Sequence, residues 1–105
     1  MVKKEDIIKK LKLFKESINK EIPISKMFFF GSFASGNPHK WSDIDLVIVS
    51  PKFRRKKTYK RARKLYDYWN FDYPVDFLCY TPEEFNKLKK QITIVREAVE
   101  NGIEI

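Results

Sequence analysis

The sequence feature that most constrains the fold is a pair of apolar segments joined by a short polar loop. Residues 24–30 end in three consecutive phenylalanines, and residues 43–49 read Asp-Ile-Asp-Leu-Val-Ile-Val. Between them lie Gly-Ser at 31–32 and Gly-Asn-Pro at 36–38, which are typical turn formers. The pattern predicts two strands connected by a tight turn and a loop. Because apolar residues occur on both faces of the second strand, we expect it at or near the middle of a sheet covered on both sides.

Two aspartates open this second strand. Asp43 and Asp45 are two residues apart, so on a strand they project from the same face with Cα atoms roughly 6–7 Å apart. Two carboxylates this close repel each other, and Asp is a poor strand residue. Taken alone, the pair is equally consistent with solvated residues at a strand end. A divalent cation such as Mg²⁺, which prefers hard oxygen ligands, would explain why the chain accepts both costs.

The turn before the loop offers a complementary group. Gly31 allows the backbone to approach a ligand closely, and adjacent N–H groups with the Ser32 hydroxyl can cradle phosphate oxygens. Alone, a Gly-Ser pair is more often an ordinary turn, and Ser42 is an ordinary cap. The order and spacing of the two motifs together favour a site for phosphate and a metal ion.

The two-part motif resembles the signature of the DNA polymerase β-like nucleotidyltransferase superfamily: Gly-Ser, ten residues, then Asp-x-Asp on an apolar strand. Gly-Ser-Phe-Ala-x-Gly at 31–36 and Ser-Asp-Ile-Asp-Leu at 42–46, in a chain of 105 residues, are similar to the minimal nucleotidyltransferases (MNT). These small proteins are often encoded beside a HEPN-domain protein. The resemblance covers nearly the whole chain. It implies an α/β fold, a small mixed β-sheet flanked by helices, in a single domain spanning residues 1–105.

The resemblance also implies the chemistry, which is nucleotidyl transfer from ATP with release of pyrophosphate. Asp43 and Asp45 would hold two Mg²⁺ ions, and Asp76, on a strand next to theirs, would complete one metal site and help deprotonate the acceptor hydroxyl. The implied phosphate-binding residues are Gly31, Ser32 and Ser42. Family members commonly carry Arg just before the second Gly of the turn motif, where this chain has Ser35.

A partner follows from the same resemblance. It implies a HEPN ribonuclease toxin that is silenced by transfer of AMP to one of its hydroxyls, so that this chain would be an antitoxin. A chain this short has no obvious second domain to hold the acceptor, which agrees with a partner doing so. The alternative is a non-catalytic binding module that neutralises its partner by contact through a basic patch. A third possibility, an RNA-binding or RNA-modifying protein, lacks an aromatic platform in the sequence.

The basic patch lies at residues 52–64, the densest positive charge in a chain of net charge +8. Such charge favours a polyanionic or acidic partner, either RNA or an acidic protein surface. It equally suits the solvated face of a helix at 57–69. The inner stripe of that helix would be Ala62, Leu65, Tyr66 and Trp69.

Hydrophobic periodicity predicts the remaining elements. An amphipathic helix is expected over 3–20, with an apolar stripe of Ile7, Leu11, Phe14 and Ile18. A third strand is expected over 75–80. Thr-Pro-Glu-Glu at 81–84 is a typical helix start, so its glutamates are capping residues rather than catalysts, and this helix runs to about residue 90.

The C-terminal part is expected to form a second helix over 92–101. Its inward residues would be Ile92, Val95 and Val99, with Gly102 as the C-terminal cap. The segment 103–105 is expected to pack on the core.

Several single residues carry weaker signals. The one histidine, His39, is expected in a surface loop, and Trp41 is expected to pack against the sheet. The one cysteine, Cys79, excludes a disulfide framework and a cysteine-based zinc site, and is expected to be a small buried apolar residue. No run is apolar enough for a membrane span and no signal-peptide pattern opens the chain, so a cytoplasmic protein is expected.

Overall fold

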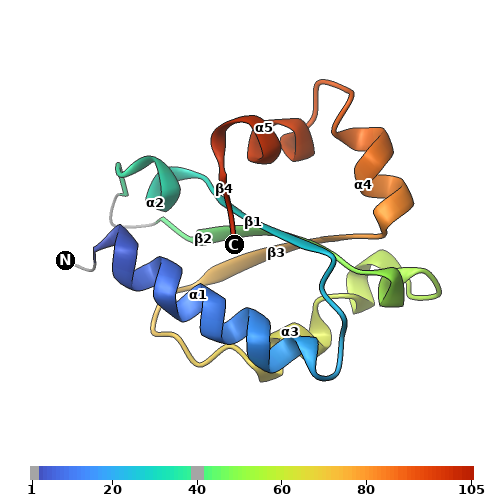
Figure 1. Cartoon of the computed structure of the whole chain (residues 1–105), viewed down its shortest axis with the longest axis horizontal. Coiled ribbons are helices and arrows are strands. Elements are labelled where there is room, and N and C mark those ends of the chain that lie inside the picture. Colours follow the sequence, from blue (N-terminus) through green and yellow to red (C-terminus); the bar gives the residue numbers. More distant parts are fainter. Residues whose placement is uncertain (1–2, 39–41) are drawn as a thin grey trace.

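The computed structural model describes residues 3–38 and 42–105, which form a four-stranded mixed sheet with helices on both faces (Figure 1). In chain order the elements are α1 (Lys4–Asn19), β1 (Lys26–Phe30), α2 (Ser32–Ser35), β2 (Ile44–Val49), the 3₁₀ turns η1 (Pro51–Phe53) and η2 (Thr58–Lys60), α3 (Arg63–Asp67), β3 (Val75–Tyr80), α4 (Pro82–Leu88), α5 (Ile94–Asn101) and β4 (Ile103–Glu104). The predicted fold class, α/β with a small mixed sheet, is confirmed. The expectations for His39 and Trp41 lie outside the described residues.

The strand order is β3-β2-β1-β4, so β2 lies inside the sheet as its apolar faces predicted. β1 pairs antiparallel with both β2 and β4, whereas β2 and β3 are parallel. The two-residue β4 shows that the 103–105 segment does pack on the core, as an added edge strand.

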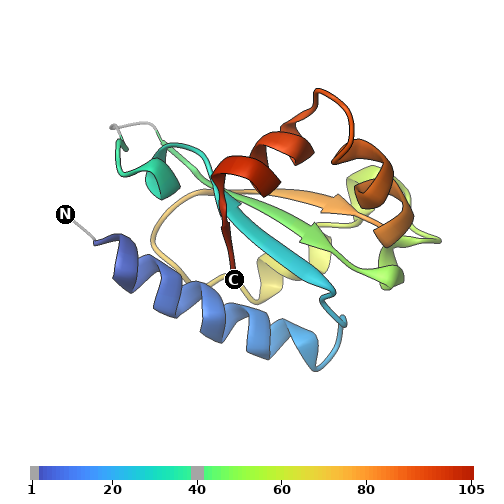
Figure 2. The same cartoon turned by 45° about the horizontal axis from the view of Figure 1, so that its top comes forward.

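Alternation along β2 separates two apolar cores. Ile44, Leu46 and Ile48 lie in the larger core with the buried stripe of α1 and with Leu65 of α3. Val47 and Val49 lie on the other face, in a smaller core shared with α4 and α5. Figures 1 and 2 show the corresponding layers, with α1 and α3 on one side of the sheet and α4 and α5 on the other. The aspartates therefore occupy the face that α4 and α5 partly cover.

The prediction of one helix over 57–69 was wrong. The chain there forms η2 and then the short α3, and Arg61 between them turns inward instead of facing solvent with its neighbours. Its backbone N–H bonds the Thr58 carbonyl three residues back, as in a 3₁₀ turn. Within the expected inner stripe Leu65 is buried, but Tyr66 is 50% exposed.

The inward face of the last helix was also partly wrong. Val95 is buried as predicted, but Ile92 is 95% exposed and Val99 is 36% exposed. The helix begins at Ile94, because the Thr93 hydroxyl caps it by accepting the Arg96 N–H, so Ile92 precedes the first turn.

The C-cap of α5, the start of α4 and the burial of Cys79 are as predicted. The C-cap of α5 is Gly102, and a Cβ there would lie 2.4 Å from the carbonyl oxygen of Ala98, so the close approach requires glycine. Thr81 and Glu84 form a capping box at the start of α4, and Cys79 is buried. Within the described residues, no helix is both long and apolar enough to cross a bilayer.

Candidate active site

Asp45 and Asp76 are brought together by the sheet. Asp45 on β2 is the register partner of Asp76 on the parallel strand β3. Neighbouring strands lie about 4.8 Å apart, and partners in register project from the same face. Both carboxylates therefore lie side by side near the beginning of their strands, 31 positions apart in sequence. Asp43 is exposed and comes one residue before β2, where the Ile44 N–H bonds the Pro74 carbonyl and holds this end of the strand against β3.

Gly31 closes the same site from β1. The last residue of β1, Phe30, is the antiparallel partner of Asp45, so the turn that follows passes directly beside this carboxylate. Gly31 has φ +84°, and a Cβ on it would lie 2.2 Å from Asp45 Oδ2. Glycine is thus required twice at this position, for the backbone conformation and for the space that Asp45 occupies.

A serine pair fixes the loop that joins the two motifs. Ser32 opens the four-residue helix α2, and its hydroxyl donates to the Ser42 hydroxyl at 2.9 Å. Ser42 is buried next to Asp43. Ser35, at the position of the usual family Arg, is exposed and donates to the Ser32 carbonyl, so it closes the α2 turn. The two halves of the motif are therefore tied together by their own hydroxyl groups.

Asp45 is a carboxylate of the site whose pKa is shifted. Partial burial raises the pKa of its carboxyl group, and the neighbouring charges of Asp76 and then Asp43 raise it further. All three carboxylates thus lie close enough for their charges to interact. A cation placed among them would reverse this effect, because it favours the ionised form.

The oxygen donors of these carboxylates fit a divalent metal, although their side chains do not converge on one coordination centre. Three Asp side chains offer hard oxygen ligands of the kind that Mg²⁺ prefers. No group of three His, Cys, Asp or Glu side chains in residues 3–38 and 42–105 is arranged to hold a metal ion as it stands. Mg²⁺ usually takes one or two carboxylates and completes its shell with water and substrate phosphates, so a preformed three-ligand cage is not required.

Comparison with known proteins agrees with this geometry. The family model "Nucleotidyltransferase domain" matches residues 8–101, which is most of the chain. The chain belongs to this family. Members act on a nucleoside triphosphate with a divalent metal in general. A search of curated proteins found no match.

Two solved structures are similar to this nucleotidyltransferase-domain protein. A candidate nucleotidyltransferase from Sulfolobus solfataricus is 18% identical, with a TM-score of 0.67 over 96% of this chain and 80% of its own. A second candidate nucleotidyltransferase is 24% identical and has a TM-score of 0.48 over 79% of this chain and 87% of its own. At these identities the first likeness supports the polymerase β-like fold and nothing finer.

Tyr66 lies near Asp76 and Asp43, and the sequence did not indicate this. Its ring packs edge-on against Phe77, and its hydroxyl donates to the Val75 carbonyl at 3.4 Å. Burial raises the pKa of the phenol, and the charges of Asp76 and Asp43 add to the shift. Helical periodicity assigned Tyr66 to the core, whereas the structure leaves it 50% exposed.

The basic segment 52–64 begins away from the carboxylates. It follows the C-terminal end of β2, whereas Asp43 and Asp45 lie at the N-terminal end, and six residues of strand span about 17 Å. Figure 1 shows the same separation, with α2 at one end of the sheet and η1 and η2 near the other. The segment is therefore not the phosphate-binding side of the active site.

Proposed function

We propose that this nucleotidyltransferase-domain protein transfers AMP from ATP to a protein hydroxyl, with Mg²⁺ bound by Asp43, Asp45 and Asp76. The proposed acceptor is a HEPN-domain ribonuclease toxin, which the transfer silences, so that the protein is an antitoxin. The observation that carries the proposal is the pairing of Asp45 with Asp76 on parallel strands directly beside Gly31.

Each group has a distinct part in the proposed reaction. The metal, when bound, would neutralise the charge that develops on the phosphates as pyrophosphate leaves. Asp43 and Asp45 are its proposed ligands, and Asp76 is placed beside Asp45 to share this role and to accept the proton of the attacking hydroxyl. The turn at Gly31 and Ser32, linked to Ser42, is the proposed seat of the triphosphate.

The electrostatics of the carboxylates in the metal-free protein support their assignment as metal ligands. Burial raises the pKa of Asp45, the charges of Asp76 and Asp43 raise it further, and ionised Asp45 therefore costs free energy in the metal-free protein. Binding of a divalent cation converts this repulsion into attraction. Carboxylates that repel one another when no metal is bound are typical of a cation-binding site.

The test is incubation with α-labelled ATP and Mg²⁺, with and without a HEPN-domain protein encoded beside it. The wild type is compared with Asp43→Asn/Asp45→Asn, which removes two charges while keeping the side-chain shapes. The matched control is Glu16→Gln/Glu97→Gln, which removes two exposed carboxylates elsewhere. We expect label on the partner with the wild type and the control, and none with the aspartate variant.

Two results would contradict the proposal. Wild-type transfer by the aspartate variant would refute the site. Absence of transfer by the wild type, together with a stable complex that the aspartate variant forms equally well, would favour the non-catalytic binding module.

A further inference from the structure

The basic segment carries more charge than the fold uses. Residues 52–64 contain nine of the 22 Lys and Arg residues, and no acidic residue occurs from Pro51 to Tyr66. Three of the nine are engaged in ion pairs: Arg54 with Glu83, Arg61 with Glu84 and Lys64 with Glu21. The other six form what we call the cationic patch: Lys52, Arg55, Lys56, Lys57, Lys60 and Arg63. All six are exposed and, among the described residues, have no salt bridge.

This patch is held by a rigid base rather than carried on a loose tail. Phe53, the last residue of η1, is fully buried, and the Arg61 guanidinium lies between three hydrogen-bond acceptors. It donates to the carbonyls of Lys56 and Cys79 at 3.1 and 3.2 Å, and to Glu84 at 2.6 Å. Since the backbone of the segment is fixed in this way, the exposed cations have a defined arrangement.

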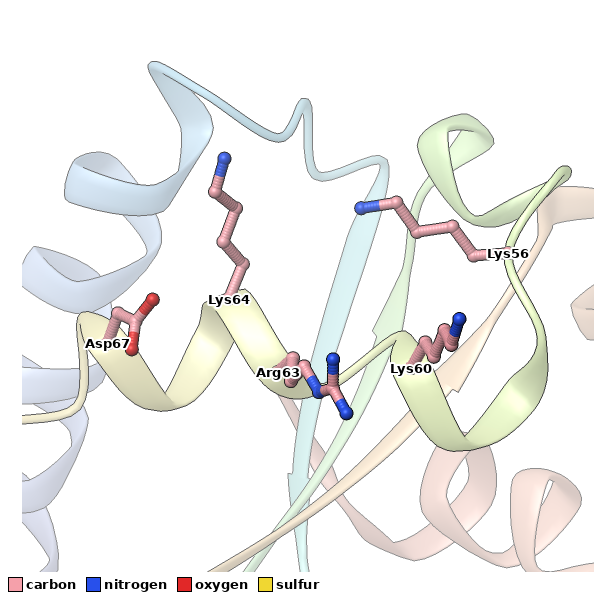
Figure 3. A pocket seen from close by; sticks show the side chains of 5 residues that line it. All are labelled: Lys56, Lys60, Arg63, Lys64 and Asp67. Carbon is pink, nitrogen blue, oxygen red and sulfur yellow. The ribbon is translucent and has the colours of Figure 1, made fainter.

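Part of the patch surrounds a pocket of about 470 Å³ (Figure 3). Lys60 and Arg63 extend from η2 and from the first turn of α3, and Lys56 reaches across from the preceding turn toward Lys64. Asp67 lies at the far end of α3. Several cations around one hollow favour an anionic ligand with more than one charge.

An exposed aromatic ring lies within the patch. Tyr59 is 70% exposed, and the Nζ of Lys60 lies 5.8 Å from the centre of its ring. An acidic protein surface needs only the cations, whereas unpaired bases stack on exposed rings while cations track the phosphates. The sequence offered no aromatic platform; the structure exposes one among the cations.

We propose that the cationic patch and Tyr59 form a binding surface for single-stranded nucleic acid, distinct from the carboxylate site. Lys57, Lys60 and Arg63 contact phosphates, and Tyr59 stacks on a base. The part of the surface at residues 52–60 follows the opposite end of β2 from Asp43 and Asp45, so binding does not require the metal site. It therefore does not depend on the proposed AMP transfer.

The probe is a fluorescein-labelled oligouridine of about 20 nucleotides, titrated with the full chain at several KCl concentrations and followed by anisotropy. We expect affinity to fall linearly on a log–log plot, with a slope of about −2 to −4 for three to six phosphate contacts. Lys57→Gln/Lys60→Gln/Arg63→Gln should make this slope shallower by about 2. Tyr59→Ala should weaken binding about five-fold or more while leaving the slope unchanged.

The matched control is Lys9→Gln/Lys12→Gln/Lys20→Gln, which removes three exposed cations from α1 and its C-cap. It should retain most of the affinity, and circular dichroism should show all variants folded. An equal loss in this control would overturn the proposal, because binding would then follow net charge alone. Binding that is insensitive to Tyr59→Ala and is competed equally by poly-glutamate would also overturn it, and would favour an acidic protein surface.

The two proposals fail separately. Asp43→Asn/Asp45→Asn should bind the oligonucleotide as the wild type does, although it is expected to lose AMP transfer. Loss of oligonucleotide binding in this variant would place the strand at the carboxylates instead of at the patch and would overturn the present proposal without touching the metal site.

Discussion

At the residue scale, Gly31 and Gly36 are glycine for different reasons. Both have φ +84°, but a Cβ on Gly31 would collide with Asp45, whereas a Cβ on Gly36 would meet nothing within 4 Å. The first glycine therefore protects the site geometry as well as the turn. The second serves only the left-handed end of α2.

Alanine at each position tests this distinction. Gly36→Ala should lower the free energy of unfolding by about 1 kcal/mol, because it places Ala at a positive φ. Gly31→Ala should lower it by more, because its Cβ would also collide with Asp45. Gly31→Ala should also displace Asp45 and abolish Mg²⁺-dependent transfer, which Gly36→Ala should leave largely intact. Urea unfolding and the labelled-ATP assay give the two readouts. Full activity in Gly31→Ala would show that Asp45 is not needed where it lies.

A second prediction concerns the pH dependence of Asp45. Its pKa is raised in the folded state, so ionised Asp45 destabilises the metal-free protein above that raised pKa. Asp45→Asn should therefore raise Tm by a few degrees at pH 7 in EDTA. The gain should shrink as pH falls and vanish below about 3.9, the ordinary Asp value, where the carboxyl is neutral in both states.

The measurement is the difference in Tm between variant and wild type across pH, which cancels the titration of the other carboxylates. Added Mg²⁺ should stabilise the wild type by mass action and leave the variant less affected. A difference in Tm that is constant with pH would contradict the assigned electrostatics.

At the scale of elements, Arg61 anchors the basic segment to the rest of the fold. It is 7% exposed and links the segment to β3 and α4, while Arg54, seven residues earlier, pairs with Glu83 in solvent. Two arginine–glutamate pairs thus join the basic segment to α4, one buried and one exposed. This offers a comparison of buried and exposed ion pairs within one interface.

Truncation of each arginine should have unequal effects. Arg61→Met should cost about 2–3 kcal/mol, because two backbone carbonyls and Glu84 lose their buried donor. Arg54→Met should cost much less, because the exposed pair is hydrated and screened by salt. Urea unfolding with the m-value checked gives both numbers. Equal costs would mean that the inward turn of Arg61 is not what anchors the segment.

The whole molecule is organised by two apolar cores on a four-stranded sheet, and Cys79 reports on the larger one. It is buried on β3, and burial raises its thiol pKa to about 12. A reactive thiolate is therefore almost absent at neutral pH unless the strand leaves the sheet. Exposure of this thiol requires the core to open.

Alkylation of Cys79 should consequently track global unfolding. In native buffer at pH 8, iodoacetamide should label the thiol at least about 10³-fold more slowly than in urea, where its pKa returns to about 8.5. Mass spectrometry against time gives the rate. Fast labelling without denaturant would show that β3 opens locally at the edge of the sheet.

The sequence by itself determined the elements whose information is local. The apolar residues on both faces of 43–49 predicted a central strand, and the spacing of Ile7, Leu11, Phe14 and Ile18 predicted a buried helix face. The capping residues at 81–84 predicted the start of α4. The order of Gly31-Ser32 and Asp43-x-Asp45 indicated the family that the comparison confirmed. These signals lie within one element or one turn, where periodicity and backbone preference act directly.

Only the tertiary structure decided how distant segments meet. The register that sets Asp45 beside Asp76 depends on strand pairing, and the inward turn of Arg61 depends on acceptors from β3 and α4. The ring of Tyr66 likewise takes its place by packing against Phe77 of β3. Each outcome was set by partners far away in the chain, since a charged or aromatic side chain takes the position in which packing and hydrogen bonding best offset the loss of water.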